Sequence, residues 1–452
     1  MTRRDLVRTT AAFSIIPARL VRGYQANQKV NVGVIGVGGV GAGNTKRLAE
    51  MGENVVALCD VDTDILDKRG QEYPRAKKYT DFRQMLDKEK LDGVVVATPD
   101  HSHAYISITA MKRGLNVYCQ KPLTKTIHEA RLMAEVAKQQ KVVTQMGTGT
   151  AAGEGTREGI EMVRSGMLGE ITEVHAWTNR ALWPQGFERP KGEDPVPANL
   201  KWDLWLGPAA VRPYKAKWPE GHPVYAVPER LNAFRQNWWT DSWSSVYHLF
   251  TWRGWQDFGT GALGDIAPHS LNVVFWGLDL GAPSAVEVVD SSGITRDMHP
   301  LWSILRFDFP SRGMHPPLKL FWYDGGKMPP PEIAGENAAG GGLVWIGTKG
   351  SLPAARGPFF GKKMEPYPKP PSIAWPYEEV HSDWVRGIKT GFQPSAHFGY
   401  AGPFTEAYLL GNIALKVGHR IEWNALSGQV TNCREANPYL KAEYRRGWEL
   451  PV

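Results

Sequence analysis

The sequence predicts an α/β fold, with a doubly wound parallel sheet in its amino-terminal half and an α+β domain with an open, mostly antiparallel sheet in its carboxyl-terminal half. Two observations support this. Apolar runs alternate with helical patterns of roughly ten residues as far as residue 148, as in successive βαβ units. Beyond residue 149, several apolar runs follow one another with few helical patterns between them. At 452 residues the chain is long enough for two domains with separate cores.

The first apolar run leads into a glycine-rich turn. The run from Val30 to Val37 carries Gly36, and Gly38 and Gly41 complete the spacing G-x-G-x-x-G before a helical pattern. Gly36 permits a tight turn off the strand, Gly38 lets the backbone approach a pyrophosphate, and Gly41 lets the helix pack on the strand. The amino terminus of that helix offers free N–H groups and the positive end of its dipole to phosphates. The turn therefore predicts a dinucleotide site.

An acidic residue ends the second apolar run and indicates which dinucleotide binds. The Asp60 carboxylate can accept hydrogen bonds from a ribose diol and would repel a 2′-phosphate, which favours NAD over NADP. A glycine triplet alone is weak evidence, but strand, glycines, helix, strand and acid in this order form a specific signal. The residues that this unit should contribute to the cofactor site are Gly36, Gly38, Gly39, Val40, Gly41 and Asp60.

The alternation of strands and helices continues to residue 148. We expect helices at 62–72, 104–113 and 126–139, and strands at 91–98, 115–119 and 142–146. Ligands of open α/β sheets bind beyond the carboxyl ends of the strands. The loops after two of these strands, Thr98–His103 and Gln120–Pro122, should therefore converge with the glycine turn. Their contribution to the cofactor site should be Thr98, Pro99, His101, His103, Gln120 and Lys121.

The pattern changes past residue 149. Helices are predicted at 154–165, 265–276, 378–389 and 401–417, strands at 171–178, 285–289, 302–309, 318–322 and 343–346, and a loop at 325–342. Residues 183–255 have little periodicity but contain nine of the 18 tryptophans. Because the apolar faces of sugars stack on aromatic rings, this segment suits a carbohydrate substrate, and Trp183 is the candidate contact. Packing in a core or a subunit interface is the alternative, and it accounts for most tryptophans.

Lys121 is the first candidate for catalysis. It ends a parallel strand on the cofactor side, where its ammonium could bind and polarise a substrate hydroxyl as hydride leaves the carbon. Partial desolvation would lower its pKa towards that of a general base. An ordinary surface lysine in a loop is the alternative. His101 and His103 could line the nicotinamide end of the site or hydrogen-bond within their own loop, and the residues alone favour the structural role.

Asp265 and His269 form the second candidate. Four residues apart, they share one face of a helix, where the carboxylate could fix the tautomer of the imidazole and raise its basicity for proton transfer. Two other roles stay open. Asp265 follows Gly264 at the expected helix start and could be the N-cap, with Pro268 tolerated in the first turn. The pair could also be half of a metal site, but no third ligand follows at a suitable spacing, so no metal is predicted.

Composition argues against several classes of protein. Three scattered cysteines, Cys59, Cys119 and Cys433, are too few for a disulfide framework or a metal cluster. No apolar run is long enough to span a bilayer. The net charge is +7, of which residues 1–23, with five arginines and one aspartate, supply +4. The rest of the chain has no basic block, so nucleic-acid binding gets no support.

Residues 1–28 are predicted to be a leader and linker outside the fold. Arg3 and Arg4 precede a short apolar stretch at residues 11–16, as in twin-arginine export signals, which predicts a periplasmic protein. A disordered basic tail on a cytoplasmic protein is the alternative. It is favoured by the shortness of the apolar stretch and by the lack of a clear cleavage site.

Together these motifs resemble those of the glucose–fructose oxidoreductase, inositol dehydrogenase and rhizopine-catabolism (Gfo/Idh/MocA) family, and most closely its exported members. The resemblance implies a Rossmann domain at 29–148 and a substrate and oligomerisation domain at 149–452, with subunits associating through the carboxyl-terminal sheet. It covers roughly residues 29–425. It rests on the order and spacing of Gly36–Gly41, Thr98–His103, Gln120–Pro122, Trp183–Gly186 and Gly259–His269.

The resemblance also implies an activity, NAD(P)-linked oxidation or reduction of a sugar or cyclitol hydroxyl. It assigns catalysis to Lys121, Asp265 and His269, which would also contact the substrate. One departure affects the site directly, because Gln120 stands where the family commonly has glutamate. The ammonium of Lys121 therefore lacks an adjacent carboxylate in sequence.

We therefore expect an NAD-dependent sugar oxidoreductase in which Lys121 polarises the reacting oxygen and His269 moves its proton. Export would call for tightly held NAD, because no soluble NAD pool recharges the enzyme outside the cytoplasm. A redox-neutral glycosidase, acting by transient oxidation at sugar C3 and elimination, is one alternative, since some relatives act in this way. A non-enzymatic dinucleotide sensor is another, although the intact Lys121, Asp265 and His269 argue against it.

Overall fold

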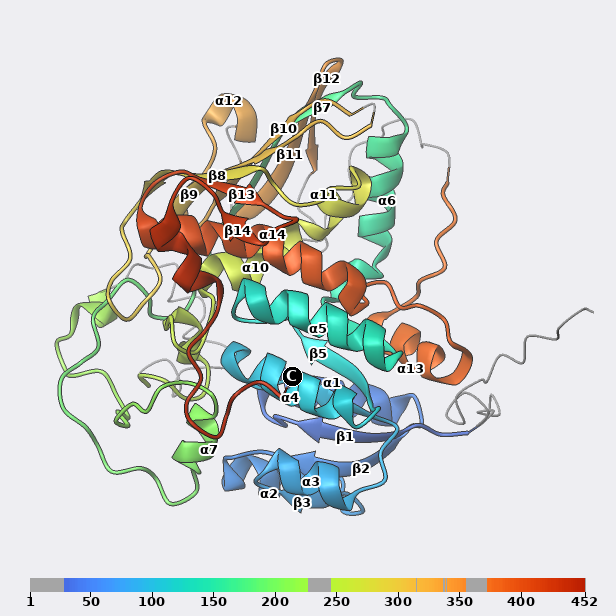
Figure 1. The fold of residues 1–452 in the computed structure, drawn as a ribbon, viewed down its shortest axis with the longest axis vertical. Helices are drawn as coiled ribbons and strands as arrows, with labels where there is room; N and C mark the ends of the chain where they lie inside the picture. Colours follow the sequence, from blue (N-terminus) through green and yellow to red (C-terminus); the bar gives the residue numbers. More distant parts are fainter. Residues whose placement is uncertain are drawn as a thin grey trace, which may run out of the picture.

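The computed structural model describes residues 28–226, 245–313, 315–335, 338, 340–354 and 372–451. They build a parallel sheet in the amino-terminal half and a larger, mixed sheet in the carboxyl-terminal half, with helices packed around and between the two (Figure 1). The predicted leader, apart from Gln28, and the middle of the tryptophan-rich segment lie outside the described residues. Within these ranges, every helix is too short or too polar to cross a bilayer.

The amino-terminal sheet has six parallel strands in the order β3-β2-β1-β4-β5-β6. Its order reverses between β1 and β4, which is the point where doubly wound sheets bind their ligands. The predicted doubly wound parallel sheet is confirmed. Its strands are β1 (Asn31–Ile35), β2 (Asn54–Cys59), β3 (Lys77–Tyr79), β4 (Gly93–Val96), β5 (Asn116–Gln120) and β6 (Thr144–Gly147).

Helices cover both faces of this sheet (Figure 1). Asp62 caps α2 by accepting from two backbone N–H groups, and Thr126 with Glu129 forms a capping box on α5. The strand β3 and the helix α3 were not predicted, because a three-residue polar strand has no apolar run to mark it. The helices are α1 (Gly39–Glu50), α2 (Thr63–Glu72), α3 (Phe82–Lys88), α4 (Asp100–Lys112) and α5 (Ile127–Gln140).

The start of α4 corrects one prediction. The segment Thr98–His103 was expected to be a loop, but α4 begins at Asp100, directly after Pro99. The fixed φ of Pro99 suits the position before a first helical turn, and Asp100 places an acidic residue in that turn. His101 and His103 are therefore helical and buried rather than displayed on a loop.

The carboxyl-terminal sheet has eight strands in the order β12-β11-β7-β10-β9-β8-β13-β14, and only β7 and β10 pair in parallel. The predicted open, mostly antiparallel sheet is confirmed. Its strands are β7 (Ile171–Thr178), β8 (Ala285–Ser291), β9 (Ser303–Phe309), β10 (Leu318–Tyr323), β11 (Gly341–Gly347), β12 (Gly350–Ala354), β13 (Ile421–Asn424) and β14 (Gln429–Val430).

The helices of this half lie partly between the two sheets and partly around them (Figure 1). The longest, α14 (Phe398–Val417), lies along α5 of the amino-terminal half (Figure 1). There Arg131 donates to the Glu406 carboxylate, which also accepts from the Trp423 indole at 2.9 Å. The others are α6 (Glu154–Arg164), α7 (Trp202–Leu206), α10 (Gly261–Ser270), α11 (Asn272–Gly277), α12 (Pro331–Ala334) and α13 (Val380–Thr390).

The helix that carries Asp265 differs from the prediction. It was expected to begin at Asp265, but α10 begins at Gly261, so Asp265 lies in its middle and is not an N-cap. Gly261 has φ +67°, a conformation that glycine adopts without strain. Leu271 separates α10 from α11, which divides the expected single helix into two short ones.

A carboxyl-terminal strap, residues 441–451, crosses from the second half back to the first, and the chain ends beside α4 (Figure 1). Tyr444 donates to the Glu129 carboxylate at 2.8 Å. The Trp448 ring lies 5.2 Å from the Tyr105 ring and 4.6 Å below the Arg83 guanidinium. The strap therefore fastens the two halves together at the level of α4.

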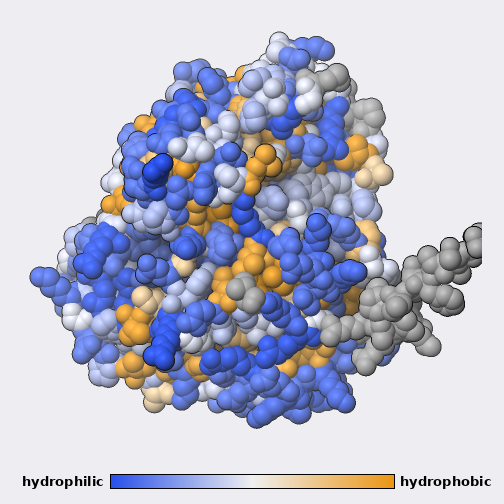
Figure 2. All heavy atoms as spheres, viewed as in Figure 1, coloured by the Kyte–Doolittle hydropathy of each residue, from blue (hydrophilic) through white to orange (hydrophobic). Residues whose placement is uncertain are grey.

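On the face shown in Figure 2, hydrophilic side chains cover most of the surface and apolar ones form small patches. Scattered exposed apolar residues are ordinary for folded proteins. Two of the large exposed ones, Val40 and Leu249, are 51% and 41% exposed, and both line the cavity described below.

The glycine turn gives a matched pair of substitutions. A Cβ at Gly41 would lie 1.8 Å from the Gly36 carbonyl oxygen, whereas a Cβ at Gly43, in the same helix, would meet no atom within 4 Å. Gly41→Ala should therefore lower the free energy of unfolding by about 1–3 kcal/mol. Gly43→Ala should raise it by about 0.5–1 kcal/mol, because alanine suits a helix better. Urea unfolding measures both, and equal effects would contradict the close approach at Gly41.

Candidate active site

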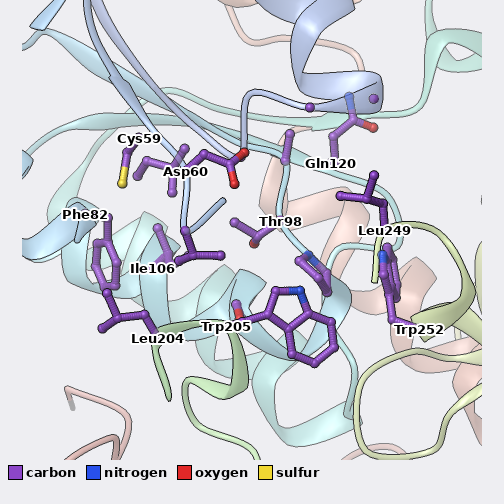
Figure 3. A pocket seen from close by; sticks show the side chains of 18 of the residues that line it. Cys59, Asp60, Phe82, Thr98, Ile106, Gln120, Leu204, Trp205, Leu249 and Trp252 are labelled. Atoms are coloured by element: carbon purple, nitrogen blue, oxygen red, sulfur yellow. The ribbon is translucent and has the colours of Figure 1, made fainter. Parts of the chain in front are cut away.

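A cavity of about 220 Å³ lies at the carboxyl edge of the parallel sheet, on the side of the glycine turn. In Figure 3, Asp60 and Gln120 reach it from β2 and β5, and Trp205, Leu249 and Trp252 face them from the carboxyl-terminal half. Of the predicted cofactor residues, those that line it are Gly36, Gly38, Gly39, Val40, Asp60, Thr98, Pro99, Gln120 and Lys121.

The glycine turn is shaped by contacts with its own strand and with β4. Gly36 has φ +81°, its N–H donates to the Cys59 carbonyl at 2.8 Å, and a Cβ there would lie 2.6 Å from the Ala97 oxygen. Gly41 packs directly on the Gly36 carbonyl, which explains why it supports the turn without lining the cavity. Gly38, Gly39 and Val40, at the start of α1, do line the cavity, and the first N–H groups of a helix are suited to binding phosphate.

Asp60 is held rigidly at the end of β2. Its carboxylate accepts from the backbone N–H groups of Val37 at 2.9 Å and of Asp62 at 3.0 Å. Burial raises the pKa of Asp60, and these two donors partly offset that effect. Each carboxylate oxygen has a further lone pair, so both can also accept from the hydroxyls of a ribose diol.

Lys121 and Asp265 form the central contact of the site. The Lys121 ammonium donates to Asp265 Oδ1 at 2.6 Å and to the Asp265 backbone carbonyl at 3.0 Å. Both side chains are about nine-tenths buried, with 12% and 10% exposure. Burial alone would raise the pKa of Asp265, but the charges of Lys121 and Arg253 outweigh it and lower that pKa well below its usual range. Asp265 is therefore an anion at neutral pH.

Arg253 is a site residue that the sequence analysis missed. Its Nε donates to Asp265 Oδ1 at 3.1 Å, and its guanidinium lies 4.3 Å from the centroids of both the Phe250 and Trp252 rings. The aromatic rings replace water around the cation, so the positive charge persists beside the carboxylate. The sequence signal that could have indicated Arg253 is its position in Thr-Trp-Arg-Gly-Trp, because an arginine between aromatic residues often stacks on their rings.

His269 lies one helical turn after Asp265, with its Nδ1 3.5 Å from the Thr148 hydroxyl. Burial and then the positive charge of Lys121 lower the pKa of His269 to about 3, although the charge of Asp265 opposes them. The imidazole is therefore neutral at physiological pH and can accept a proton. Asp265 acts on it through charge, while the Asp265 carboxylate itself accepts from Lys121 and Arg253.

Gln120 fills the position where the related pattern has glutamate. Its side-chain amide donates to Asn44 Oδ1 at 3.2 Å, and the same oxygen lies 3.0 Å from His381 Nε2. A carboxylate in place of the amide could not donate to Asn44. The Gln120 amide therefore suits the hydrogen bond to Asn44. Because Gln120 carries no charge, the carboxylate that contacts the Lys121 ammonium is that of Asp265.

Two histidines predicted for the cofactor site, His101 and His103, lie away from the cavity. His101 is buried between Phe258 and Trp205, with its ring nitrogens 3.3 and 3.0 Å from their carbonyl oxygens. His103 lies between the carbonyls of Thr98 and Pro122, at 2.8 and 2.9 Å. Both histidines therefore hold the backbone around the site, and they do not line the cavity as predicted for a cofactor contact.

Trp183, the predicted sugar contact, is 3% exposed in this structure. Its indole donates to Gln185 at 3.0 Å, and its ring packs edge-on against Phe250. It therefore supports the aromatic layer beneath Arg253, and its contact with substrate stays a prediction. The tryptophans that do line the cavity are Trp205, Trp252 and Trp448.

A clasp joins the carboxyl-terminal half to the β2–α2 loop beside Asp60. Asp62 accepts from Asn199 at 2.9 Å, and its second oxygen lies 3.0 Å from His248 Nε2. Burial would raise the pKa of Asp62, but the bonds from His248 and Asn199 outweigh it and lower that pKa. The Lys201 N–H also donates to the Val61 carbonyl at 2.9 Å. Two residues of the clasp region, Val61 and His248, also line the cavity.

Comparison with known proteins bears on the amino-terminal half. Residues 30–148 match the model of a family described as an oxidoreductase family with an NAD-binding Rossmann fold. A glycosyl hydrolase family 109 protein of Shewanella pealeana is 29% identical over 157 residues, covering 32% of this chain and 34% of that protein. An inositol 2-dehydrogenase of Salmonella typhimurium is 28% identical over 153 residues, covering 32% and 45%. The chain thus spans less than half the length of these curated relatives.

The likeness extends further in structure than in sequence. The WlbA dehydrogenase of Bordetella pertussis, solved in complex with NADH and UDP-GlcNAcA, superposes with a TM-score of 0.57 at 16% identity. The superposition covers 88% of this chain and 99% of that one. At such low identity it establishes the shared fold of both halves.

The neutral state of His269 predicts how stability depends on pH. Its pKa is about 3 in the folded chain, and an unfolded histidine titrates near about 6.5. Between these values the unfolded chain binds a proton that the folded chain lacks. The contribution of the neutral His269 to the free energy of unfolding is therefore complete above about pH 6.5. It is lost as the pH falls below that value, by up to about 1.4 kcal/mol per pH unit.

His269→Gln should reduce this slope, as measured by urea unfolding between roughly pH 7 and pH 4. The exposed His128→Gln is the matched control and should leave the slope unchanged. A His269→Gln slope equal to that of the wild type would show that the folded chain does not hold this imidazole neutral.

Proposed function

We propose, from the match of residues 30–148 to the Gfo/Idh/MocA oxidoreductase family with its NAD-binding Rossmann fold, that the protein transfers a hydride between a hydroxyl carbon of a sugar or sugar-like polyol and nicotinamide. The observation that carries this proposal is the contact between Lys121, which lines the cofactor cavity, and the buried Asp265 carboxylate. The carbohydrate class is supported by the inositol dehydrogenase and nucleotide-sugar dehydrogenase among the similar proteins.

The residues of the cavity fit NAD. Gly38, Gly39 and Val40, at the start of α1, line the cavity where a pyrophosphate would lie, and Asp60 offers carboxylate oxygens where a ribose diol would lie. A carboxylate held there repels the 2′-phosphate of NADP, which favours NAD. When bound, NAD supplies the acceptor for the hydride.

Lys121 binds and polarises the reacting oxygen. An ammonium has three N–H donors, and Asp265 accepts two of them, so the third is available to a substrate hydroxyl. The positive charge stabilises the negative charge that develops on that oxygen. Asp265 and Arg253 fix the position of the ammonium, which gives the hydroxyl a defined orientation.

His269 takes the hydroxyl proton. Its low pKa keeps the imidazole neutral, so the base is ready without prior deprotonation. The negative charge of Asp265 stabilises the imidazolium that forms, and it is the cause that raises the pKa of His269. The reverse reaction uses the same proton to convert a carbonyl into a hydroxyl.

Tight retention of NAD is a further part of the proposal. His248 of the clasp and the Trp448 ring of the strap both line the cavity and belong to the carboxyl-terminal half, so movement of these segments would govern cofactor release. Retention would suit a protein exported through a twin-arginine leader at Arg3 and Arg4. Blocking that export route should then change where the protein is found.

Redox-neutral glycoside cleavage is the second candidate, favoured by the similarity of the amino-terminal third to glycosyl hydrolase family 109 proteins. In that cycle oxidation at C3 acidifies the C2 proton, elimination breaks the glycosidic bond, water adds and C3 is reduced again. Product analysis distinguishes the two candidates. Free keto-sugar supports the dehydrogenase, and cleaved glycoside without net change in NAD supports the glycosidase.

Lys121→Ala should lower turnover by roughly 10²–10⁴-fold, because the reacting oxygen loses its only nearby ammonium. The measurement is NADH formation with a panel of sugars, and the circular dichroism spectrum checks the fold. Lys125→Ala is the matched control, since Lys125 lies just past the same loop and does not line the cofactor cavity. Full turnover in Lys121→Ala would favour a non-catalytic dinucleotide sensor.

His248→Ala should weaken cofactor retention, because the clasp loses one of the two side chains that hold Asp62. Protein purified without added cofactor is denatured, and the released NAD and NADH are quantified per chain. We expect near-stoichiometric cofactor in the wild type and several-fold less in the variant. A wild-type protein that is purified without NAD, binds NAD weakly and still oxidises free sugar would refute tight retention of NAD. It would remain consistent with dehydrogenase activity.

A further inference from the structure

We propose a zinc site on the surface of the carboxyl-terminal half, formed by His419, Cys433 and Glu435 and separate from the cofactor cavity. His419 follows Gly418, which ends α14, and the other two residues follow β14 at the start of η5 (Arg434–Leu440). Their donor atoms, one from each side chain, all lie within 4.8 Å of one another. Across the described ranges of the chain, no other three such side chains meet this spacing.

The distances fit a tetrahedral ion. His419 Nε2 lies 3.8 Å from Cys433 Sγ and 3.8 Å from Glu435 Oε1. Zinc bonds of about 2.0–2.3 Å at tetrahedral angles place neighbouring donor atoms roughly 3.3–3.7 Å apart, so small movements would close the site. A thiolate with an imidazole selects zinc over the oxygen-seeking magnesium and calcium ions.

The hydrogen bonds of His419 leave the correct nitrogen free for a metal. Its Nδ1 lies 3.1 Å from the Arg420 carbonyl, which can only accept, so Nδ1 must donate. In the neutral ring the lone pair then lies on Nε2, the nitrogen that faces Cys433 and Glu435. A histidine held by a backbone carbonyl in this way is the usual arrangement behind a metal ligand.

The backbone around the three ligands is fixed by two asparagines. Asn432 donates to the Arg420 carbonyl at 3.0 Å and accepts from the Glu422 N–H at 2.8 Å. Asn437 accepts from the Val430 N–H at 2.9 Å and donates to its carbonyl at 3.0 Å. These bonds join the segment after α14 to the segment after β14, so the ligands approach each other on a preformed frame.

The site is open to solvent on one side. The His419 and Glu435 side chains are 52% and 69% exposed, whereas Cys433 is 3% exposed. An ion can therefore enter from water and keep a water molecule as its fourth ligand. Once bound, it would tie the end of α14 to η5 and so anchor the start of the strap.

Cobalt tests the thiolate ligand directly. The full-length protein, without a polyhistidine tag, is reduced, freed of metal with a chelator and titrated with Co²⁺. We expect one ion per chain, a thiolate-to-cobalt charge-transfer band in the near ultraviolet, and displacement of cobalt by Zn²⁺. Cys433→Ser should abolish the band, and His419→Ala should weaken zinc binding at least tenfold in calorimetry.

Zinc should also raise the thermal midpoint of the wild type and leave that of Cys433→Ser unchanged. The exposed His128→Ala is the matched control and should behave as the wild type in all three measurements. The proposal is overturned by a wild type without the thiolate band, by a band that survives Cys433→Ser, or by zinc affinity unchanged in His419→Ala. The His419 variant keeps the test valid if the Cys433 variant fails to fold.

Discussion

The buried contact between the Lys121 ammonium and the Asp265 carboxylate constrains the charged groups of the site and the packing of the two halves of the chain. Taking two charges out of water costs several kcal/mol for each unless they meet good partners. Here each charge is the other's partner, and Arg253 adds a second cation to the same oxygen. The neighbouring Asp100 shows how strong this local field is, because burial and then the charge of Asp265 raise its pKa to about 7.

This contact also fixes how the two halves of the chain meet. Lys121 follows the last residue of β5, Asp265 lies in the middle of α10, and a hydrogen bond of 2.6 Å tolerates little displacement between them. The helices that surround this contact are also joined to one another by hydrogen bonds. Thr260 donates to Asp100 at 2.8 Å, and its carbonyl accepts from Asn412 at 2.9 Å, which joins α4, the start of α10 and α14. The site and the interface between the halves are thus one structure.

The sequence was sufficient for the fold and for much of the site, because those features depend on local signals. Alternating apolar runs and a glycine turn with its acid define a parallel sheet and its ligand edge, and Gln120 and Lys121 lie at that edge as expected. Helix starts were less predictable. Asp265 follows a glycine and looks like a cap, but the preceding Gly-Ala-Leu-Gly is itself helical, since packing overrides the low propensity of glycine. Arg253 and His248 could not be found, because their partners Asp265 and Asp62 come from elements whose approach no local pattern encodes.

The strap has a consequence for how the protein is made. Gly36 and Trp448 both line the cavity, so its wall is assembled from residues far apart in the sequence. A ribosome delivers the polypeptide from the amino terminus, and the parallel sheet can form while the strap is still being translated. Such a nascent chain would have the glycine turn and Asp60 but an open pocket. Firm binding of the dinucleotide would then be possible only after the strap has been translated and has packed against α4.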